Sequence, residues 1–151
     1  MVMRNSFPRL IYKGKNIKKY PNLTLKIIFR YKDKILMLKH PNGAFEFPGG
    51  RMEWRESIFG ALKRELKEEL NYNLKKEPEL FDLWNYISKN GRRHSVMIYF
   101  IYQLDKKPKF PSPEKLEILW LKKEKVIPII KDKKLIEKIF RWPNQKNFTS
   151  I

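Results

Sequence analysis

The hydrophobic positions in the first third of the chain fall into short β-prone runs. Two of them, residues 23–30 and 34–39, flank the polar tripeptide Tyr31-Lys32-Asp33, as the strands of a hairpin would. Residues 44–47 can extend as well, and Pro48-Gly49-Gly50 breaks the chain after them. The pattern therefore predicts paired strands that lead into a loop.

Helical spacing replaces this pattern over residues 57–70, which contain no proline. Ala61, Leu62, Leu66 and Leu70 stand there among good helix formers. Asn71 follows, and asparagine tolerates the left-handed conformation in which many helices end. The loop is therefore expected to enter a helix that ends at residue 70.

The second half of the chain predicts further strands at residues 81–87, 94–103 and 116–121. Asn90-Gly91 lies between the first two and indicates a hairpin. Residues 131–140 carry apolar positions at helical spacing and predict a second helix. Mixed α and β elements with short connections predict an α+β fold, with a sheet covered by helices.

Composition bounds the class of protein. A chain of 151 residues with 42% hydrophobic residues, without repeats or a linker, is expected to form a single domain over residues 1–151. No stretch reaches the roughly 20 apolar residues of a membrane span, so we expect a cytoplasmic protein with no membrane partner. The absence of cysteine excludes disulfides and thiolate metal sites.

The formal net charge is +18, from 34 Lys and Arg against 16 Asp and Glu. Such a charge attracts polyanions, so nucleotides and RNA are candidate partners. A lysine-rich surface that reflects composition alone is the alternative, because charge by itself specifies no site.

Three glutamates lie on or beside the apolar face of the predicted helix. With about 100° per residue and Ile58 as the reference, Ala61, Leu62 and Leu66 fall within roughly 80° of it. Glu65 and Glu69 fall within about 20° of Ile58, and Glu68 lies at the margin of that arc. Because buried carboxylates without partners are costly, a positive charge is expected to meet them.

Their spacing of i, i+3 and i+4 makes the three carboxylates neighbours on one side of the helix. An oxygen-only donor set suits a hard divalent cation, Mg²⁺ first and Mn²⁺ as the alternative. On these residues alone, a solvated cluster balanced by Lys63, Arg64 and Lys67 remains an equal alternative.

The surrounding residues follow a longer pattern. Five residues separate Gly50 from Glu56 and seven more separate Glu56 from Arg64, which residues 65–69 (ELKEE) follow directly. This stretch resembles the signature of the Nudix hydrolases, G-x5-E-x7-R-E-U-x-E-E-x-G-U, in which U is a bulky aliphatic residue. Every fixed position up to residue 69 matches, so the motif is a specific one.

The signature departs from the family only at its end. Asn71 stands where the family has glycine and Tyr72 where it has an aliphatic residue, and asparagine keeps the backbone option of glycine. Outside the signature, residues 45–50 (FEFPGG) look like the family's entry to the loop. Residues 117–120 (EILW) look like its later acidic strand, and the order of elements can be followed over residues 23–121.

The resemblance implies the fold and a metal site. The fold would be the Nudix α/β/α sandwich, a mixed central sheet with the catalytic loop and helix on one side. Glu65, Glu68 and Glu69 would ligate the metal, with a backbone carbonyl of Gly49 or Gly50 nearby.

The resemblance also implies catalytic roles. Arg64 would orient a catalytic glutamate, as a guanidinium fork can do by paired hydrogen bonds, and Glu56 would support the geometry of the loop and helix. Glu65 is the first candidate for the base or ligand. Glu117 is the second candidate for the base, with a solvated strand carboxylate as its equal alternative.

The function predicted from the resemblance is metal-dependent hydrolysis of a pyrophosphate bond in a nucleoside diphosphate linked to another moiety. Alternatives are an RNA 5′-pyrophosphohydrolase, MutT-like cleansing of nucleoside triphosphates, and a non-catalytic nucleotide- or RNA-binding module. The oligomeric state is left open between monomer and homodimer.

Among weaker signals, Phe47, Trp84 and Tyr86 are candidates to stack on a nucleobase, although aromatic residues in strands are more often core. His40 and His94 have no partner at ligand spacing and are expected to be incidental.

Overall fold

The computed structural model describes residues 20–110 and 116–143. Its strands are β1 (Asn22–Tyr31), β2 (Lys34–Lys39), β3 (Phe45–Glu46), β4 (Gly49–Arg51), β5 (Glu79–Ile87), β6 (His94–Gln103) and β7 (Glu117–Lys122). Its helices are α1 (Ile58–Leu70), α2 (Lys123–Val126) and α3 (Lys133–Arg141). The basic first 19 residues lie outside the described residues.

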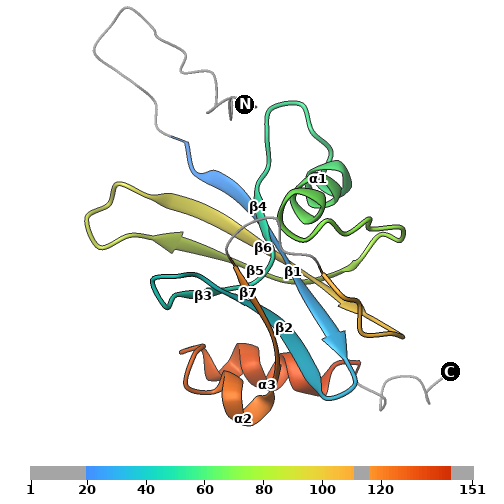
Figure 1. The fold of residues 1–151 in the computed structure, drawn as a ribbon. Helices are drawn as coiled ribbons and strands as arrows, with labels where there is room; N and C mark the ends of the chain where they lie inside the picture. Colours follow the sequence, from blue (N-terminus) through green and yellow to red (C-terminus); the bar gives the residue numbers. More distant parts are fainter. Residues whose placement is uncertain (1–19, 111–115, 144–151) are drawn as a thin grey trace, which may run out of the picture.

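The strands form one mixed sheet in the order β3-β2-β1-β6-β5, with β4 paired to β1 and β7 paired to β2 (Figure 1). Only β1 and β6 run parallel among the described pairs; the other pairs are antiparallel. The first half of β1 pairs with β4 and its last residues pair with β2. This split lets a single strand support both the β2–β3 hairpin and the glycine loop, which comprises Gly49, Gly50 and the residues that lead from them into α1.

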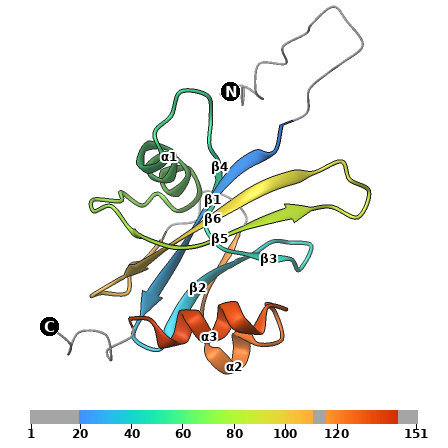
Figure 2. The ribbon, with the colours of Figure 1, turned by 180° about the vertical axis from the view of Figure 1, so that it is seen from behind.

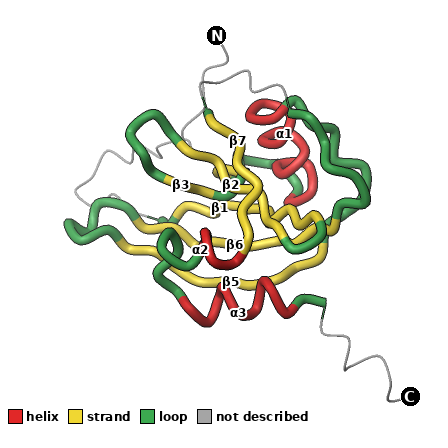
Figure 3. The backbone as a smooth tube through the Cα atoms, turned by 60° about the horizontal axis from the view of Figure 1, so that its bottom comes forward, coloured by secondary structure: helices red, strands yellow, loops and turns green. Residues whose placement is uncertain are grey.

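Helices cover both faces of the sheet. Leu25, Ile27 and Phe29 of β1 pack with the apolar residues of α1 in one core cluster. Ile28 faces the other way and packs with α2 and α3 in a second cluster. The view from behind and the tube drawing show the strands between α1 and the α2–α3 pair (Figures 2 and 3). The α/β/α arrangement predicted from the resemblance is confirmed.

The predicted strands and helices are present, with bounds that lie within one or two residues of the predicted ones, and both predicted hairpins form. At the Asn90-Gly91 hairpin, Gly91 has a φ of 67° and its N–H donates to the Ser88 carbonyl. Two short elements were not predicted. Residues 49–51, interpreted as a break, form β4, because the backbone of glycine can pair closely with β1. The four-residue α2 is too short to show a helical period.

Both ends of α1 are capped as its sequence requires. The Ser57 hydroxyl accepts a hydrogen bond from the Gly60 N–H, and Asn71 adopts φ 50° and ψ 34°, in the left-handed region. The choice of Ile58 as the centre of the buried face was wrong, because this side chain is 45% exposed. As the first residue of α1, it lies beyond the part of the helix that packs on the sheet.

Within the part of the chain that the structure describes, no helix combines the length and the apolar character required to cross a bilayer.

Asn71 provides a test of the helix end. Asn71→Gly should leave the free energy of unfolding unchanged or raise it slightly, because glycine adopts a positive φ without a steric penalty. Asn71→Ala should lower it by about 1 kcal/mol, because an alanine Cβ is strained in the left-handed region. Urea denaturation of the two variants measures the difference, and equal stability of the two would contradict this explanation of the helix end.

Candidate active site

Strand pairing brings the glycine loop beside α1. Gly49 and Gly50 of β4 lie opposite Lys26 and Leu25 of β1, and α1 packs against β4. The chain then returns through residues 52–57 into the start of α1, so that backbone of the loop and one side of the helix face each other (Figure 1).

Glycine at both loop positions allows the close approach of α1. A Cβ on Gly50 would lie 2.5 Å from the Cδ and Oε1 atoms of Glu65 and would displace this carboxylate. Gly49 has a φ of 128°, a conformation that side chains rarely adopt. Its N–H donates to Oε2 of Glu69 over 3.2 Å. Two carboxylates of α1 are thereby in direct contact with the backbone of the loop.

Arg64 ties the loop to the helix. Its Nε and Nη2 donate to the two oxygens of Glu56 over 2.5 and 3.0 Å, and Nη2 also donates to the Arg51 carbonyl. Nη1 donates to Oε1 of Glu65 over 2.9 Å. The hydrogen bond from Arg64 holds the pKa of Glu56 below its usual range, and the same bond raises the pKa of the guanidinium. This frame of paired hydrogen bonds leaves Glu65 little freedom to rotate.

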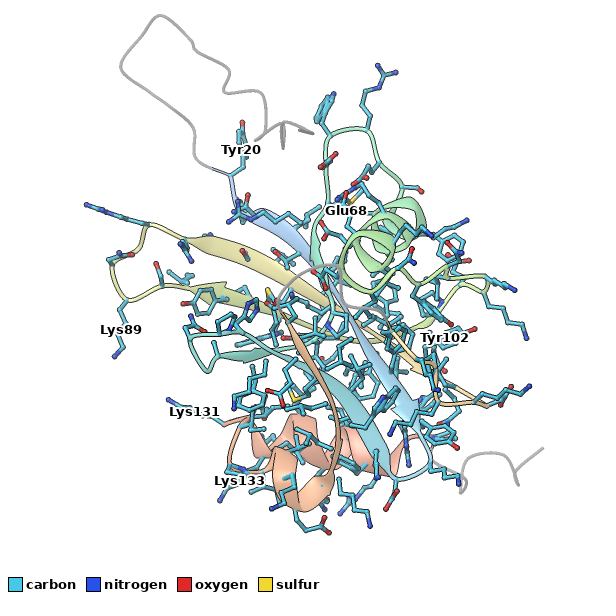
Figure 4. All side chains as sticks on the ribbon, in the orientation of Figure 1. Tyr20, Glu68, Lys89, Tyr102, Lys131 and Lys133 are labelled. Atoms are coloured by element: carbon cyan, nitrogen blue, oxygen red, sulfur yellow. The ribbon has the colours of Figure 1, made fainter. Side chains whose placement is uncertain are left out.

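The three predicted carboxylates differ in exposure. Glu65 is only 8% exposed and Glu69 is half-buried, whereas Glu68 is exposed and lies 3.5 Å from Nη1 of Arg64. Burial raises the pKa of Glu69 to about 8, although Lys26 and the Gly49 N–H act in the opposite direction. The ionised form of Glu69 therefore requires further positive charge nearby. Figure 4 shows Glu68 on α1, at the opposite end of the molecule from Lys131 and Lys133.

A buried lysine lies beside the junction, the place where α1 meets the glycine loop, and was not identified from the sequence. Lys26 is 9% exposed, and its Nζ donates to the Gly49 carbonyl over 3.2 Å and to Oε2 of Glu46 over 3.3 Å. His40, expected to be incidental, lies 2.7 Å from the other oxygen of Glu46. The signal that could have revealed Lys26 is its position as the one charged residue between Leu23 and Phe29.

Aromatic residues continue the face of the sheet on which Lys26 lies. Tyr99 is the register partner of Lys26 on β6. Its ring packs edge-on against Phe47 at 6.1 Å and stacks with Trp84 at 6.4 Å. Of the predicted stacking residues, Phe47 is buried, whereas Trp84 and Tyr86 are about half exposed. Trp84 is therefore an accessible flat surface linked by ring contacts to the candidate site.

Glu117 makes no described contact with the junction of α1 and the glycine loop. It is exposed at the start of β7, opposite Lys39 of β2. No hydrogen bond or ion pair between described residues joins it to the loop or to α1. A separate groove of about 610 Å³ between β5 and α3, lined by residues such as Leu80, Lys134 and Lys138, touches none of the predicted site residues.

The donors at the junction fit a hard divalent cation. Within residues 20–110 and 116–143, no three His, Asp or Glu side chains form a ready-made metal cluster. Glu65 nevertheless lies against Gly50, Glu69 accepts from the Gly49 N–H, and the Gly49 carbonyl belongs to the same two-residue segment, so the loop and α1 offer three oxygen donor groups. Mg²⁺ needs few protein ligands, because it keeps several waters and takes others from substrate phosphates.

Comparison with known proteins identifies similar chains. An ADP-ribose pyrophosphatase of Methanocaldococcus jannaschii is 31% identical over 104 residues, which cover 63% of this chain and 61% of that relative. The match therefore spans less than two-thirds of the relative's length.

Solved structures resemble this fold. A MutT protein from Bacillus halodurans is 30% identical with a TM-score of 0.58, covering 79% of this chain and 82% of that one. The dihydroneopterin triphosphate pyrophosphohydrolase of E. coli has a TM-score of 0.64 at 17% identity, covering 84% of this chain and 99% of that one. At that identity, the second likeness concerns the fold alone.

The family model of the NUDIX domain matches residues 23–143. These residues include the described sheet apart from Asn22, the helices α1, α2 and α3, and the loop whose glycines meet Glu65 and Glu69. The chain therefore belongs to the NUDIX domain family.

Proposed function

We propose that this protein is a metal-dependent pyrophosphohydrolase that cleaves a nucleoside diphosphate linked to another moiety, with ADP-ribose as the first candidate substrate. The observation that carries the proposal is the meeting of two α1 carboxylates, Glu65 and Glu69, with the backbone of Gly49 and Gly50. Arg64 and Lys26 offset only part of the cost of burying these groups, since burial still raises the pKa of Glu69 to about 8. A bound divalent cation would favour the ionised form of Glu69, which supports a metal site here.

The proposed metal ligands are Glu65, Glu69 and the Gly49 carbonyl, with exposed Glu68 contributing from the solvent side. Mg²⁺ or Mn²⁺, when bound, would supply charge neutralisation for the diphosphate and activation of the attacking water. Gly50 gives the carboxylates room to approach the backbone.

In this proposal Arg64 and Glu56 are positioning residues. Their paired hydrogen bonds hold the loop on the helix and fix one oxygen of Glu65. Glu65 remains the first candidate for the base, because it lies at the junction where a diphosphate would be bound. Glu117 is the weaker candidate, since its position opposite Lys39 at the start of β7 leaves it joined to neither the loop nor α1.

The choice of substrate rests on two observations. The M. jannaschii relative is an ADP-ribose pyrophosphatase, and Trp84 offers a half-exposed ring that could stack on an adenine. The net charge of +18 favours RNA as the second candidate substrate, with 5′-pyrophosphate removal as the reaction. MutT-like cleansing of triphosphates uses the same chemistry. A non-catalytic module is the least favoured, because every carboxylate of the signature is retained.

Glu69→Gln tests the metal-dependent reaction. With Mg²⁺ and ADP-ribose, kcat/KM should fall at least about a hundredfold, because a ligand charge is lost while the amide keeps the shape of the side chain. Glu77→Gln, at an exposed position outside the signature, is the matched control and should retain activity. Full activity of Glu69→Gln would remove the basis of the proposal.

Substrate preference is tested by comparing ADP-ribose, dinucleoside polyphosphates, oxidised triphosphates and 5′-triphosphate RNA with Mg²⁺ and Mn²⁺. We expect ADP-ribose to have the highest kcat/KM. Trp84→Ala should raise its KM about tenfold with little change in kcat, because a stacking surface is lost. Leu83→Ala, also exposed on β5, should leave KM unchanged. Tight RNA binding without metal-dependent turnover would instead favour the binding module.

The pKa of Glu69 predicts how stability depends on pH in EDTA. The folded protein retains the Glu69 proton up to a pH of about 8, whereas the unfolded chain releases it near 4.5. The unfolded state therefore binds fewer protons between these values, and the free energy of unfolding should decrease as the pH rises from 5 to 8. Urea denaturation should show a smaller decrease for Glu69→Gln, which has no proton to lose. The same slope in both proteins would contradict the assignment to Glu69.

A further inference from the structure

Lys26 is the charged residue in the buried stretch of β1, residues 24–29. The residues that follow it on β1, Ile27, Ile28 and Phe29, are fully buried, and Lys26 itself is 9% exposed. Burying an ammonium costs free energy unless acceptors compensate for the lost water. Its two acceptors are the Gly49 carbonyl at 3.2 Å and the Glu46 carboxylate at 3.3 Å.

One of these acceptors is a proposed metal ligand. A divalent cation bound to the Gly49 carbonyl would lie within a few ångströms of the Lys26 ammonium. Two cations at that separation repel each other strongly in a partly buried site, where water screens them poorly. Full ligation of the metal by this carbonyl therefore requires the ammonium to withdraw.

The second acceptor offers a place to which the ammonium can withdraw. Glu46 lies on β3 and already accepts from Lys26, while its other oxygen is held by His40 at 2.7 Å. The β2–β3 hairpin carries both residues, and β1 pairs with β4 rather than with β3 beside Lys26. A small rotation of the long lysine side chain would exchange the carbonyl for the carboxylate without breaking strand pairing.

We propose that the Lys26 ammonium competes with the metal for the Gly49 carbonyl, and that Glu46, held by His40, receives the ammonium when a divalent cation binds. This inference rests on the proposed function, because it assumes a metal at the glycine loop. Lys26 is in this sense a positioning residue that sets the metal affinity of the site. Lys26 and Glu46 form an ion pair at 3.3 Å, and both act on the pKa of Glu69, so the three groups lie close together.

A purely structural role for the Lys26–Glu46 ion pair predicts the opposite change in metal affinity when Lys26 is removed. If Lys26 only holds β3 to the glycine loop, its removal would disorder the ligands and weaken metal binding. If Lys26 competes with the metal, its removal tightens metal binding even though the protein becomes less stable. The sign of the change in metal affinity therefore separates the two roles.

The experiment is a titration of the full chain with Mn²⁺ alone, in which electron paramagnetic resonance measures the free ion. Lys26→Met, which removes the charge and keeps the length, should bind Mn²⁺ about tenfold more tightly than the wild type. Lys26→Arg should not bind more tightly, because it keeps the charge. Lys67→Met, on the exposed side of α1, is the matched control for the loss of one positive charge and should change the affinity less than twofold.

Unchanged or weaker binding by folded Lys26→Met, or equal tightening by Lys67→Met, would overturn the inference. Should Lys26→Met fail to fold, Lys26→Gln makes the same comparison with a donor that carries no charge. Glu46→Gln should weaken Mn²⁺ binding in the wild type, and this effect should vanish in the Lys26→Met background. An equal effect of Glu46→Gln in both backgrounds would contradict a role through Lys26.

Different results would overturn the proposed function and the competition between Lys26 and the metal. A wild type without Mg²⁺-dependent hydrolysis, or one whose Mn²⁺ affinity is not altered by Glu69→Gln, would overturn the metal site itself. A wild type that hydrolyses substrate with Mg²⁺, and whose Mn²⁺ affinity does not rise on removal of Lys26, would overturn only the competition.

Discussion

The burial of two carboxyl groups where α1 meets the glycine loop is the constraint on which the rest of the site depends. Glu65 lies against Gly50 so closely that a single added carbon atom would displace it. Glu69 accepts from the Gly49 N–H and has its pKa raised to about 8 by burial. Carboxylates are retained in such surroundings only where positive charge compensates for the lost water.

Positive charge reaches the junction from two sides. Arg64 supplies it from within α1, where its fork joins Glu56, Glu65 and the backbone of the loop. Lys26 supplies it from β1, through the Gly49 carbonyl. The guanidinium has fixed geometry and stabilises one arrangement of the loop. The ammonium is a compact charge on a flexible stem, so it can exchange partners while the surrounding strands keep their positions.

The sheet makes this combination possible. Because β1 pairs with β4 along its first half and with β2 only at its end, the glycine loop and the β2–β3 hairpin approach Lys26 from different strands. The parallel neighbour β6 adds Tyr99 on the same register, with Trp84 stacked on it. The proposed metal ligands, a counter-charge and an aromatic surface are thus gathered around a few residues of one strand.

The sequence by itself determined the features that depend on near neighbours. The proximity of the α1 carboxylates follows from helical spacing, because residues three or four positions apart meet on any helix. The cap at Asn71 follows from the tolerance of asparagine for the left-handed conformation, and the role of Arg64 was implied by the resemblance. The strands and hairpins followed from local pattern in the same way. Ile58 was the exception, since a wheel cannot tell where packing on the sheet begins.

Only the tertiary structure decided the contacts that join distant segments. Lys26 meets Gly49 and Glu46 across about twenty residues of chain, and the pairing that makes β4 a strand is set by the register of β1. The separation of Glu117 from the loop was decided in the same way. Strand register is fixed by the burial of whole faces of the sheet, a property of the folded molecule that no short stretch of sequence contains.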